Sequence, residues 1–215
     1  MMTAHEASAR TRAMCLLGPI IPVLVVNDAA KAKPLAEALV AGGLKVLEVT
    51  MRTPEALDVI AEMAQVEGAV VGAGTVLSRE DVDACLAAGA EFAVAPGATD
   101  MLLDAGEAAG LPMLPGAATA SEAMRLLERG YDMLKFFPAE AAGGVNMLKS
   151  LGGPLPQIGF CPTGGISPKN AQNYLSLDNV ICAGGSWVAP ADLVEKGDWA
   201  GITALAAEAA GLSRS

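Results

Sequence analysis

Lys135 is a residue whose position suggests chemistry. It lies within Met133–Pro138, a short apolar run that is typical of a buried strand. Burial removes the hydration of an ammonium group and favours the neutral amine. A neutral amine is the nucleophile with which enzymes form Schiff bases on carbonyl substrates. The alternative is that Lys135 extends to the surface or pairs with a carboxylate, as many lysines beside apolar surface do.

A second set of polar side chains lies along and just after the strand-like run Val46–Met51. Glu48, Thr50 and Arg52 alternate along the chain, so an extended backbone would present all three on one side. Glu48 has apolar neighbours on both sides, and a carboxyl group in apolar surroundings is suited to proton transfer. Arg52 can bind a carboxylate through two hydrogen bonds. An ion pair of Glu48 with Lys135 or Arg52, without any catalytic task, is the alternative.

Two pairs of glycines suggest an anion site. Gly164–Gly165 and Gly184–Gly185 each follow a strand-like run, and Ser186 comes directly after the second pair. Glycine lets the backbone approach a ligand closely, and exposed peptide N–H groups bind phosphate oxygens. Tight turns without a ligand are the alternative. The positions favour phosphate, because they match the last two strand ends of a barrel.

Composition excludes several classes of function. The 215 residues carry a formal net charge of −10 and contain no basic run, which argues against nucleic acid and membrane partners. The four cysteines are scattered and there is one histidine, His5, so the spacings of zinc sites and of disulfide frameworks are absent. We expect a reduced, cytoplasmic protein without a zinc site. We expect His5 to lie in a flexible tail, so the general acid–base group should be a carboxylate, a lysine or a tyrosine.

The elements that must position these residues form a repeating pattern. Apolar strand-like runs alternate with alanine-rich helical stretches at spacings of about 20–25 residues, which indicates a parallel sheet covered on both faces. Eight such units predict a (β/α)₈ TIM barrel with its site at the carboxyl ends of the strands. The predicted strands are Ile20–Val26, Val46–Met51, Ala69–Ala73, Phe92–Ala95, Met113–Pro115, Met133–Phe137, Gly159–Pro162 and Val180–Ala183.

No linker or change of composition divides the chain. We therefore expect one domain over residues 1–215, in which residues 1–17 form an extra N-terminal helix that covers the closed end of the barrel. An open doubly wound sheet is the rival fold. It is disfavoured because the dinucleotide-like string that begins at Gly72 lacks the third glycine of that fingerprint.

Five strings in this order resemble the 2-dehydro-3-deoxy-6-phosphogluconate (KDPG) aldolases, a class I family of the Entner–Doudoroff pathway. The resemblance runs from about Gly18 to the last helix. Its motifs are VLEVTMRT from Val46, VGAGTVL from Val71, KFFPAE from Lys135, FCPTGGI from Phe160 and GGSW from Gly184. Each string is weakly specific and their combination is highly specific.

The resemblance implies cleavage of a phosphorylated 2-oxo acid to pyruvate and D-glyceraldehyde 3-phosphate, by a homotrimer that needs no cofactor. It implies that Lys135 forms the Schiff base and that Glu48 is the proton acceptor and donor. It also implies a carboxylate-binding pair (Arg52, Thr75), pocket-lining residues (Pro96, Phe137, Thr163) and phosphate-binding residues (Gly164, Gly165, Gly185, Ser186). Many members also cleave 4-hydroxy-2-oxoglutarate.

Three other functions fit parts of the pattern. A related aldolase would take 4-hydroxy-2-oxoglutarate or the galactonate-derived acid. A phosphosugar isomerase or epimerase would use carboxylates, often with a metal, and would give Lys135 no task. A barrel that binds phosphate without turnover would retain the glycine pairs while Glu48 and Lys135 would be idle.

Overall fold

The computed structural model describes residues 1–214, and Ser215, the last residue of the predicted domain, lies outside the described residues. The described part contains nine strands: β1 Ile20–Leu24, β2 Val46–Thr50, β3 Val70–Gly74, β4 Phe92–Val94, β5 Met113–Leu114, β6 Gly116–Ala117, β7 Met133–Phe136, β8 Gly159–Pro162 and β9 Ala183–Gly185. The helices are α1 Ala4–Cys15, η1 Ala29–Lys31, α2 Ala32–Ala41, α3 Ala56–Met63, α4 Arg79–Ala87, α5 Asp100–Ala109, α6 Ala120–Arg129, α7 Gly144–Gly152, α8 Ala171–Leu175, α9 Ala191–Lys196 and α10 Trp199–Ala210.

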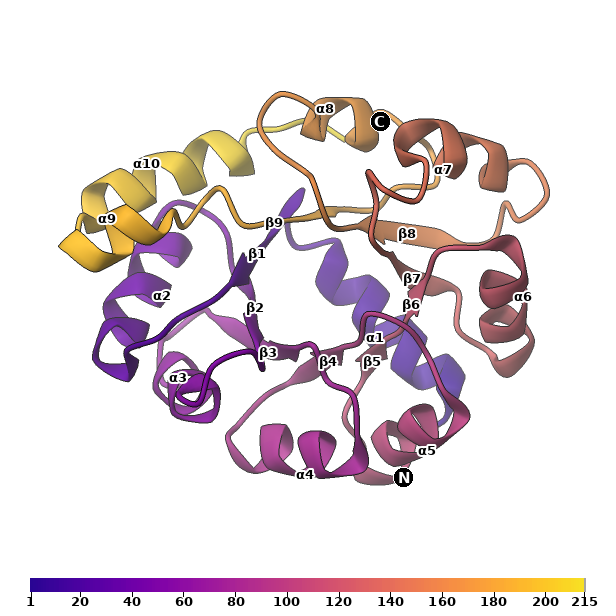
Figure 1. Cartoon of the computed structure of the whole chain (residues 1–215), viewed down its shortest axis with the longest axis horizontal. Helices are drawn as coiled ribbons and strands as arrows, with labels where there is room; N and C mark the ends of the chain where they lie inside the picture. The colour runs from indigo at the N-terminus through magenta and orange to yellow at the C-terminus, as the bar shows by residue number, and fades with distance from the viewer. Residues whose placement is uncertain (215) are drawn as a thin grey trace.

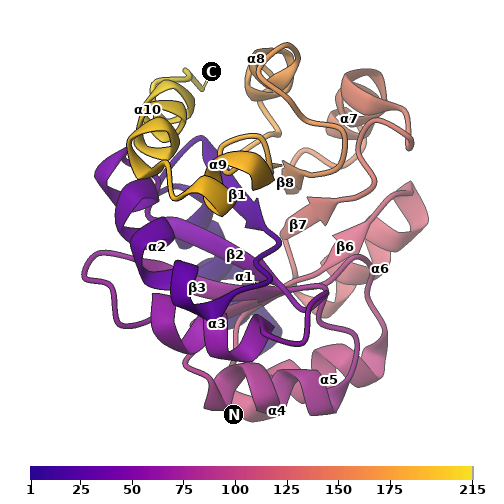
Figure 2. The same cartoon turned by 60° about the vertical axis from the view of Figure 1, so that its left-hand side comes forward.

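The strands form an α/β fold around a curled parallel sheet (Figures 1 and 2). Six strands pair in the order β5-β4-β3-β2-β1-β9, and three more pair in the order β6-β7-β8. One residue, Pro115, separates β5 from β6. On the other side, isolated parallel bridges join Phe160 to Val180 and Thr163 to Gly184, next to β8 and β9. Helices surround the strands, and α10 packs against α2.

Most predicted strands differ from those observed by one or two residues at an end, whereas the fifth and eighth need separate comment. Of Met113–Pro115 only Met113–Leu114 forms a strand, β5, and the chain resumes as β6 at Gly116, because Pro115 has no N–H to donate to a ladder. The bounds of the eighth predicted strand, Val180–Ala183, are wrong, since β9 is Ala183–Gly185 and pairs with β1 from Ile20↔Ala183 onward. The apolar run Val180–Ala183 is largely buried, as predicted, but pairing with β1 begins at Ala183 and includes Gly184 and Gly185.

Local sequence signals explain where several helices begin and end. Capping boxes at Thr3, Ser78 and Thr119 satisfy the first N–H groups of α1, α4 and α6. Gly110 and Gly130 end α5 and α6 in the left-handed conformation, which glycine adopts without steric cost. These caps fix the lengths of the connections and therefore the positions of the strand ends.

Helix α1 lies at the amino-terminal ends of the strands. Ser8 Oγ, 1% exposed, accepts from the N–H groups of Asp132 and Met133 at 2.9 and 3.0 Å and donates to Asp132 Oδ1 at 2.7 Å. Arg12 donates to the Asp132 carbonyl at 2.8 Å. The expectation that His5 lies in a flexible tail is wrong, because His5 is part of α1 and its ring lies beside Gly130.

Other global features concern membranes, thiols and metals. No helix within residues 1–214 is long and apolar enough to cross a membrane. The four cysteines are buried free thiols. In the same part of the chain, no group of three His, Cys, Asp or Glu side chains is arranged to hold a metal ion.

Candidate active site

Lys135 and Glu48 meet between the two sheets. Lys135 Nζ lies 3.2 Å from Glu48 Oε1, and the two side chains are 5% and 4% exposed. Lys135 is on β7, where it pairs in register with Gly116 and Cys161. Glu48 is on β2, between Val23 and Gly72 in register. The structure therefore brings the predicted nucleophile and the predicted acid–base group into direct contact from opposite parts of the fold.

Gly74 provides the space for the Glu48 side chain. A Cβ atom at Gly74 would clash with Glu48 Oε1 and would lie 2.7 Å from Glu48 Cγ. A residue with a side chain at this position would displace the carboxylate from Lys135. The sequence shows this signal only indirectly, as the second glycine of the string Gly72–Thr75.

Arg52 and Thr75 are also brought together, at the rim of the site. Arg52 is exposed, and its Nε donates to Thr75 Oγ1 at 3.1 Å. A guanidinium carries five N–H donors, and this contact uses one of them. Thr75 has a φ of 62°, which is rare for a β-branched residue and is found mainly where function requires it. Thr50, predicted on the same side, is buried and donates to the Leu24 carbonyl at 2.9 Å.

Phe137 connects the amine to the glycine-rich loop. Its ring centroid lies 5.3 Å from Lys135 Nζ, within the range of a cation–π contact. Its ring also borders Gly164, where a Cβ atom would be 3.4 Å away. Pro96 is half-buried, and its carbonyl occupies the space that a side chain on Gly116 would need. Phe137 thus lies beside Lys135, and Pro96 lies beside Gly116, the register neighbour of Lys135.

Thr163 has an unusual environment. It is 7% exposed, and its Oγ1 has no hydrogen-bond partner within residues 1–214. A Cβ atom at Gly184 would clash with that hydroxyl, so glycine is needed where the ends of β8 and β9 meet. Buried polar groups are almost always hydrogen-bonded, and an exception calls for an explanation such as a ligand.

The loop after β8 presents backbone in the left-handed region. Gly164 and Gly165 have φ values of 101° and 81°. Their carbonyls accept from Glu140 N at 3.1 Å and from Asn170 Nδ2 at 3.0 Å. Neither glycine N–H donates to another residue of the described chain. Consecutive peptide N–H groups left in this way suit an anion.

The loop after β9 is built differently. Gly185 is buried beneath the ring of Trp187, which would clash with any side chain there, and Ser186 is exposed. The bridge from Thr163 to Gly184 places this loop beside the first one. The four predicted phosphate-binding residues therefore come from two adjacent strand ends.

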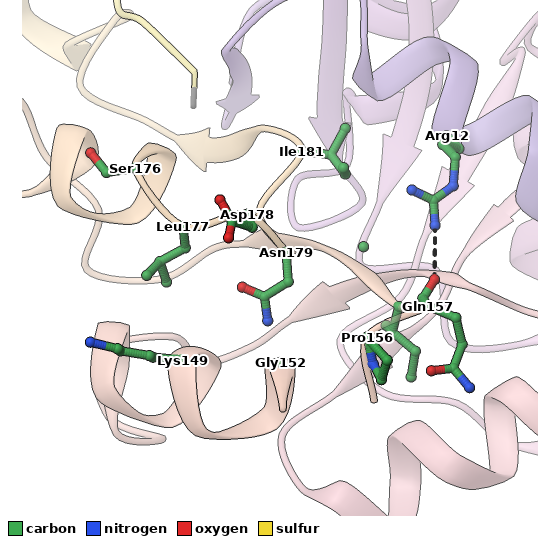
Figure 3. Close-up of a pocket in the computed structure, with 12 residues that line it drawn as sticks. Arg12, Lys149, Gly152, Pro156, Gln157, Ser176, Leu177, Asp178, Asn179 and Ile181 are labelled. Carbon is green, nitrogen blue, oxygen red and sulfur yellow. Dashed lines mark hydrogen bonds between the residues drawn. The ribbon is translucent and has the colours of Figure 1, made fainter. Parts of the chain in front are cut away.

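A separate cleft lies at the opposite end of the strands (Figure 3). It has a volume of about 530 Å³ and is lined by residues of α1, α7 and the segments before β8 and β9. In Figure 3, Arg12 donates to the Gln157 carbonyl at its edge, at 3.4 Å. None of the predicted site residues lines it, so its size does not make it the site of chemistry.

Sequence reasoning missed the residues that shape this site. Gly74 and Gly116 make room for the Glu48 carboxylate and for the backbone at Pro96. Glu140 and Asn170 hold the carbonyls of the glycine loop. The strings GAG and PAE contain two of these residues, but nothing in their pattern indicates what they contact.

A buried amine beside a carboxylate, at the ends of parallel strands, is the arrangement of an enzyme that works through a Schiff base. Comparison with known proteins makes that class specific. The family model for KDPG and KHG aldolase matches residues 11–205. The 2-dehydro-3-deoxy-phosphogluconate aldolase of Pseudoalteromonas atlantica is 57% identical over 193 residues, covering 89% of this chain and 90% of that protein.

Two solved structures extend the likeness to three dimensions. The 2-keto-3-deoxy-6-phosphogluconate aldolase of Zymomonas mobilis, solved with 3-phosphoglycerate, is 51% identical with a TM-score of 0.91, and the match covers 96% of this chain and 98% of that one. The KDPG aldolase of Legionella pneumophila, with pyruvate captured as a covalent carbinolamine, is 46% identical with a TM-score of 0.90, over 93% and 98%. The chain belongs to the KDPG and KHG aldolase family.

Proposed function

We propose that this chain cleaves 2-dehydro-3-deoxy-6-phosphogluconate to pyruvate and D-glyceraldehyde 3-phosphate through a Schiff base on Lys135. The observation that carries the proposal is the buried contact between Lys135 Nζ and Glu48 Oε1, at 3.2 Å. A proton acceptor in direct contact is what an attacking amine requires. The family membership supports the substrate, and a relative that holds pyruvate as a carbinolamine supports the covalent route.

Each step assigns a task to residues of this chain. The Lys135 amine adds to the C2 ketone, Glu48 moves the protons that turn the carbinolamine into an iminium, and the iminium accepts the electrons released when the C3–C4 bond breaks. The proton of the C4 hydroxyl leaves with Glu48 as acceptor, and D-glyceraldehyde 3-phosphate departs. Protonation of the remaining enamine at C3 and hydrolysis of the imine release pyruvate and restore the amine.

The surrounding residues orient the substrate in this proposal. Arg52 and Thr75 bind the carboxylate at the pyruvyl end, where the guanidinium still has N–H donors available. Pro96, Phe137 and Thr163 line the pocket. Gly164, Gly165, Gly185 and Ser186 bind the phosphate through backbone N–H groups and the serine hydroxyl.

The proposal extends to the architecture of the whole chain. We infer one domain over residues 1–215, in which the two sheets close into an eight-stranded barrel. Closure is supported at both junctions between the sheets. At one junction only Pro115 separates β5 from β6. At the other, the two isolated bridges link β8 to the segment that leads into β9 and to β9 itself. We further propose a cytoplasmic homotrimer without cofactor, by analogy with the family.

A coupled assay tests the function. Lactate dehydrogenase and NADH report pyruvate released from the phosphorylated acid, and the same acid without phosphate serves as the matched control. We expect kcat/KM to be at least about 100-fold higher for the phosphorylated acid. The family model also covers KHG aldolases, so 4-hydroxy-2-oxoglutarate is the second substrate to assay. No pyruvate from any of the three would contradict the proposal.

A further inference from the structure

Glu140 presents an electrostatic problem to the proposed phosphate site. Its side chain lies against Gly165, since a Cβ atom there would be 2.5 Å from Glu140 Cγ and 2.8 Å from its Cβ. Its backbone N–H also donates to the Gly164 carbonyl. A carboxylate this close to a phosphate dianion would repel it. Another group must therefore hold the Glu140 carboxylate away from the Gly164–Gly165 loop.

Tyr174 is the group that receives this carboxylate. The Tyr174 hydroxyl donates to Glu140 Oε1, and its ring on α8 is fully buried. Burial, the hydrogen bond and the negative charge of Glu140 raise the pKa of Tyr174 above its usual range, so the hydroxyl stays protonated and remains a donor. Gly144 leaves room for the pair, because a Cβ atom there would lie 3.2 Å from Tyr174 Oη and 3.5 Å from Glu140 Oε1.

The same short helix holds the other side of the loop. Asn170, the residue before α8, donates from Nδ2 to the Gly165 carbonyl at 3.0 Å and accepts from the Ser167 N–H at 2.8 Å. Figures 1 and 2 show α8 on the outer side of β8. Contacts from α8 thus reach both the loop backbone and the acidic side chain packed against it.

We propose that Tyr174 is a positioning residue for phosphate recognition, which acts by holding the Glu140 carboxylate toward α8 and away from the anion. This inference rests on the proposed function and adds a residue outside the pocket to it. Loss of the hydroxyl frees the charge of Glu140 beside the loop, so binding of phosphorylated ligands weakens while binding of pyruvate is unaffected.

The test is Tyr174→Phe, assayed in the direction of condensation. We expect KM for D-glyceraldehyde 3-phosphate to rise about fivefold to tenfold, with KM for pyruvate and kcat within about twofold of the wild type. Tyr131→Phe is the matched control, because Tyr131 is equally buried and donates to Glu107 Oε1 at 3.1 Å. This control should leave both KM values unchanged.

Two further variants separate charge from structure. In Tyr174→Phe combined with Glu140→Gln the freed charge is gone, so KM for D-glyceraldehyde 3-phosphate should return to within about twofold of the wild type. If Tyr174→Phe fails to fold, Glu140→Asp tests the same idea at an exposed residue. Aspartate keeps the negative charge, but its shorter side chain extends less far toward Tyr174. KM for D-glyceraldehyde 3-phosphate should therefore rise while KM for pyruvate stays unchanged.

The outcomes distinguish this inference from the proposed function. A wild-type chain that forms no product from pyruvate and D-glyceraldehyde 3-phosphate overturns both. An active wild type with unchanged KM in Tyr174→Phe and in Glu140→Asp overturns the role of Tyr174 alone. An equal rise in both KM values, without rescue by Glu140→Gln, shows a merely structural contact and also overturns it.

Discussion

Buried polar groups at the two ends of the strands differ in how completely they are hydrogen-bonded. At the amino-terminal end, the Ser8 hydroxyl makes three hydrogen bonds, two from backbone N–H groups and one to Asp132. At the carboxyl-terminal end, Lys135 has one carboxylate partner and the Thr163 hydroxyl has no hydrogen-bond partner within residues 1–214. Satisfied groups stabilise a fold, whereas groups left for a ligand reduce its stability. The comparison therefore separates the end that holds the protein together from the end that reacts.

The largest effect should come from Lys135→Ala. Removing the proposed nucleophile should lower kcat by at least about 10³-fold, because the substrate ketone then meets no amine beside Glu48. Far-UV circular dichroism should match the wild type, since the lost group is functional rather than core packing. A variant that loses much of its stability while its activity is only modestly reduced would contradict the contrast between the two ends.

Glu48→Gln should have the next largest effect. The amide keeps the size of the side chain but cannot accept a proton, so kcat should fall by about 10²–10⁴-fold. Some imine should still be trapped with pyruvate and borohydride, because Lys135 is intact. Measured kcat equal to that of the wild type would show that Glu48 is only a structural partner of Lys135.

Ser8→Ala tests the opposite end. It leaves the N–H groups of Asp132 and Met133 without their acceptor, so the free energy of unfolding should fall by about 1–3 kcal/mol. Urea denaturation measures this, and kcat should be unchanged. Ser121→Ala, at an exposed position, is the control and should change stability by less than about 0.5 kcal/mol. A reduced kcat in a folded Ser8→Ala protein would contradict the assignment of stability to one end of the strands and of chemistry to the other.

Thr163→Val should give the smallest change, and one of unusual sign. Valine keeps the shape and removes a buried hydroxyl that lacks a hydrogen-bond partner within residues 1–214, so stability should rise by about 0.5–1 kcal/mol. KM for the phosphorylated acid should rise at the same time if the hydroxyl serves the substrate. A fall in stability would mean that the hydroxyl is already satisfied in the free protein.

The sequence predicted the α/β class with a parallel sheet and most strands because burial and periodicity are local signals. Predicted and observed bounds agree fully for Gly159–Pro162 and differ by one residue for Phe92–Ala95. The shift at Val180–Ala183 was not predictable, because the register of β9 is decided by hydrogen bonds to β1, far away in the chain. The sequence likewise indicates a strand end at Pro115, whereas the chain continues as β6, which is defined by its pairing with β7.

The sequence singled out the residues to which we assign the chemistry, but not the residues that support them. Lys135 and Glu48 are unusual residue types within apolar runs, so they stand out in sequence. Tyr174 and Glu140 lie 34 residues apart in segments that look like ordinary surface helix and turn. Their relation exists only after α8 has packed beside the loop, which no local pattern reports.

The most direct test of the central claim is to trap the Schiff base. The protein is incubated with pyruvate and borohydride, and intact-mass spectrometry is followed by peptide mapping, with Lys149→Ala as a control at an exposed lysine. We expect one stable adduct of reduced pyruvate mass, on Lys135, in the wild type and in the control. A folded protein without an adduct, or with its adduct on another lysine, would contradict the account.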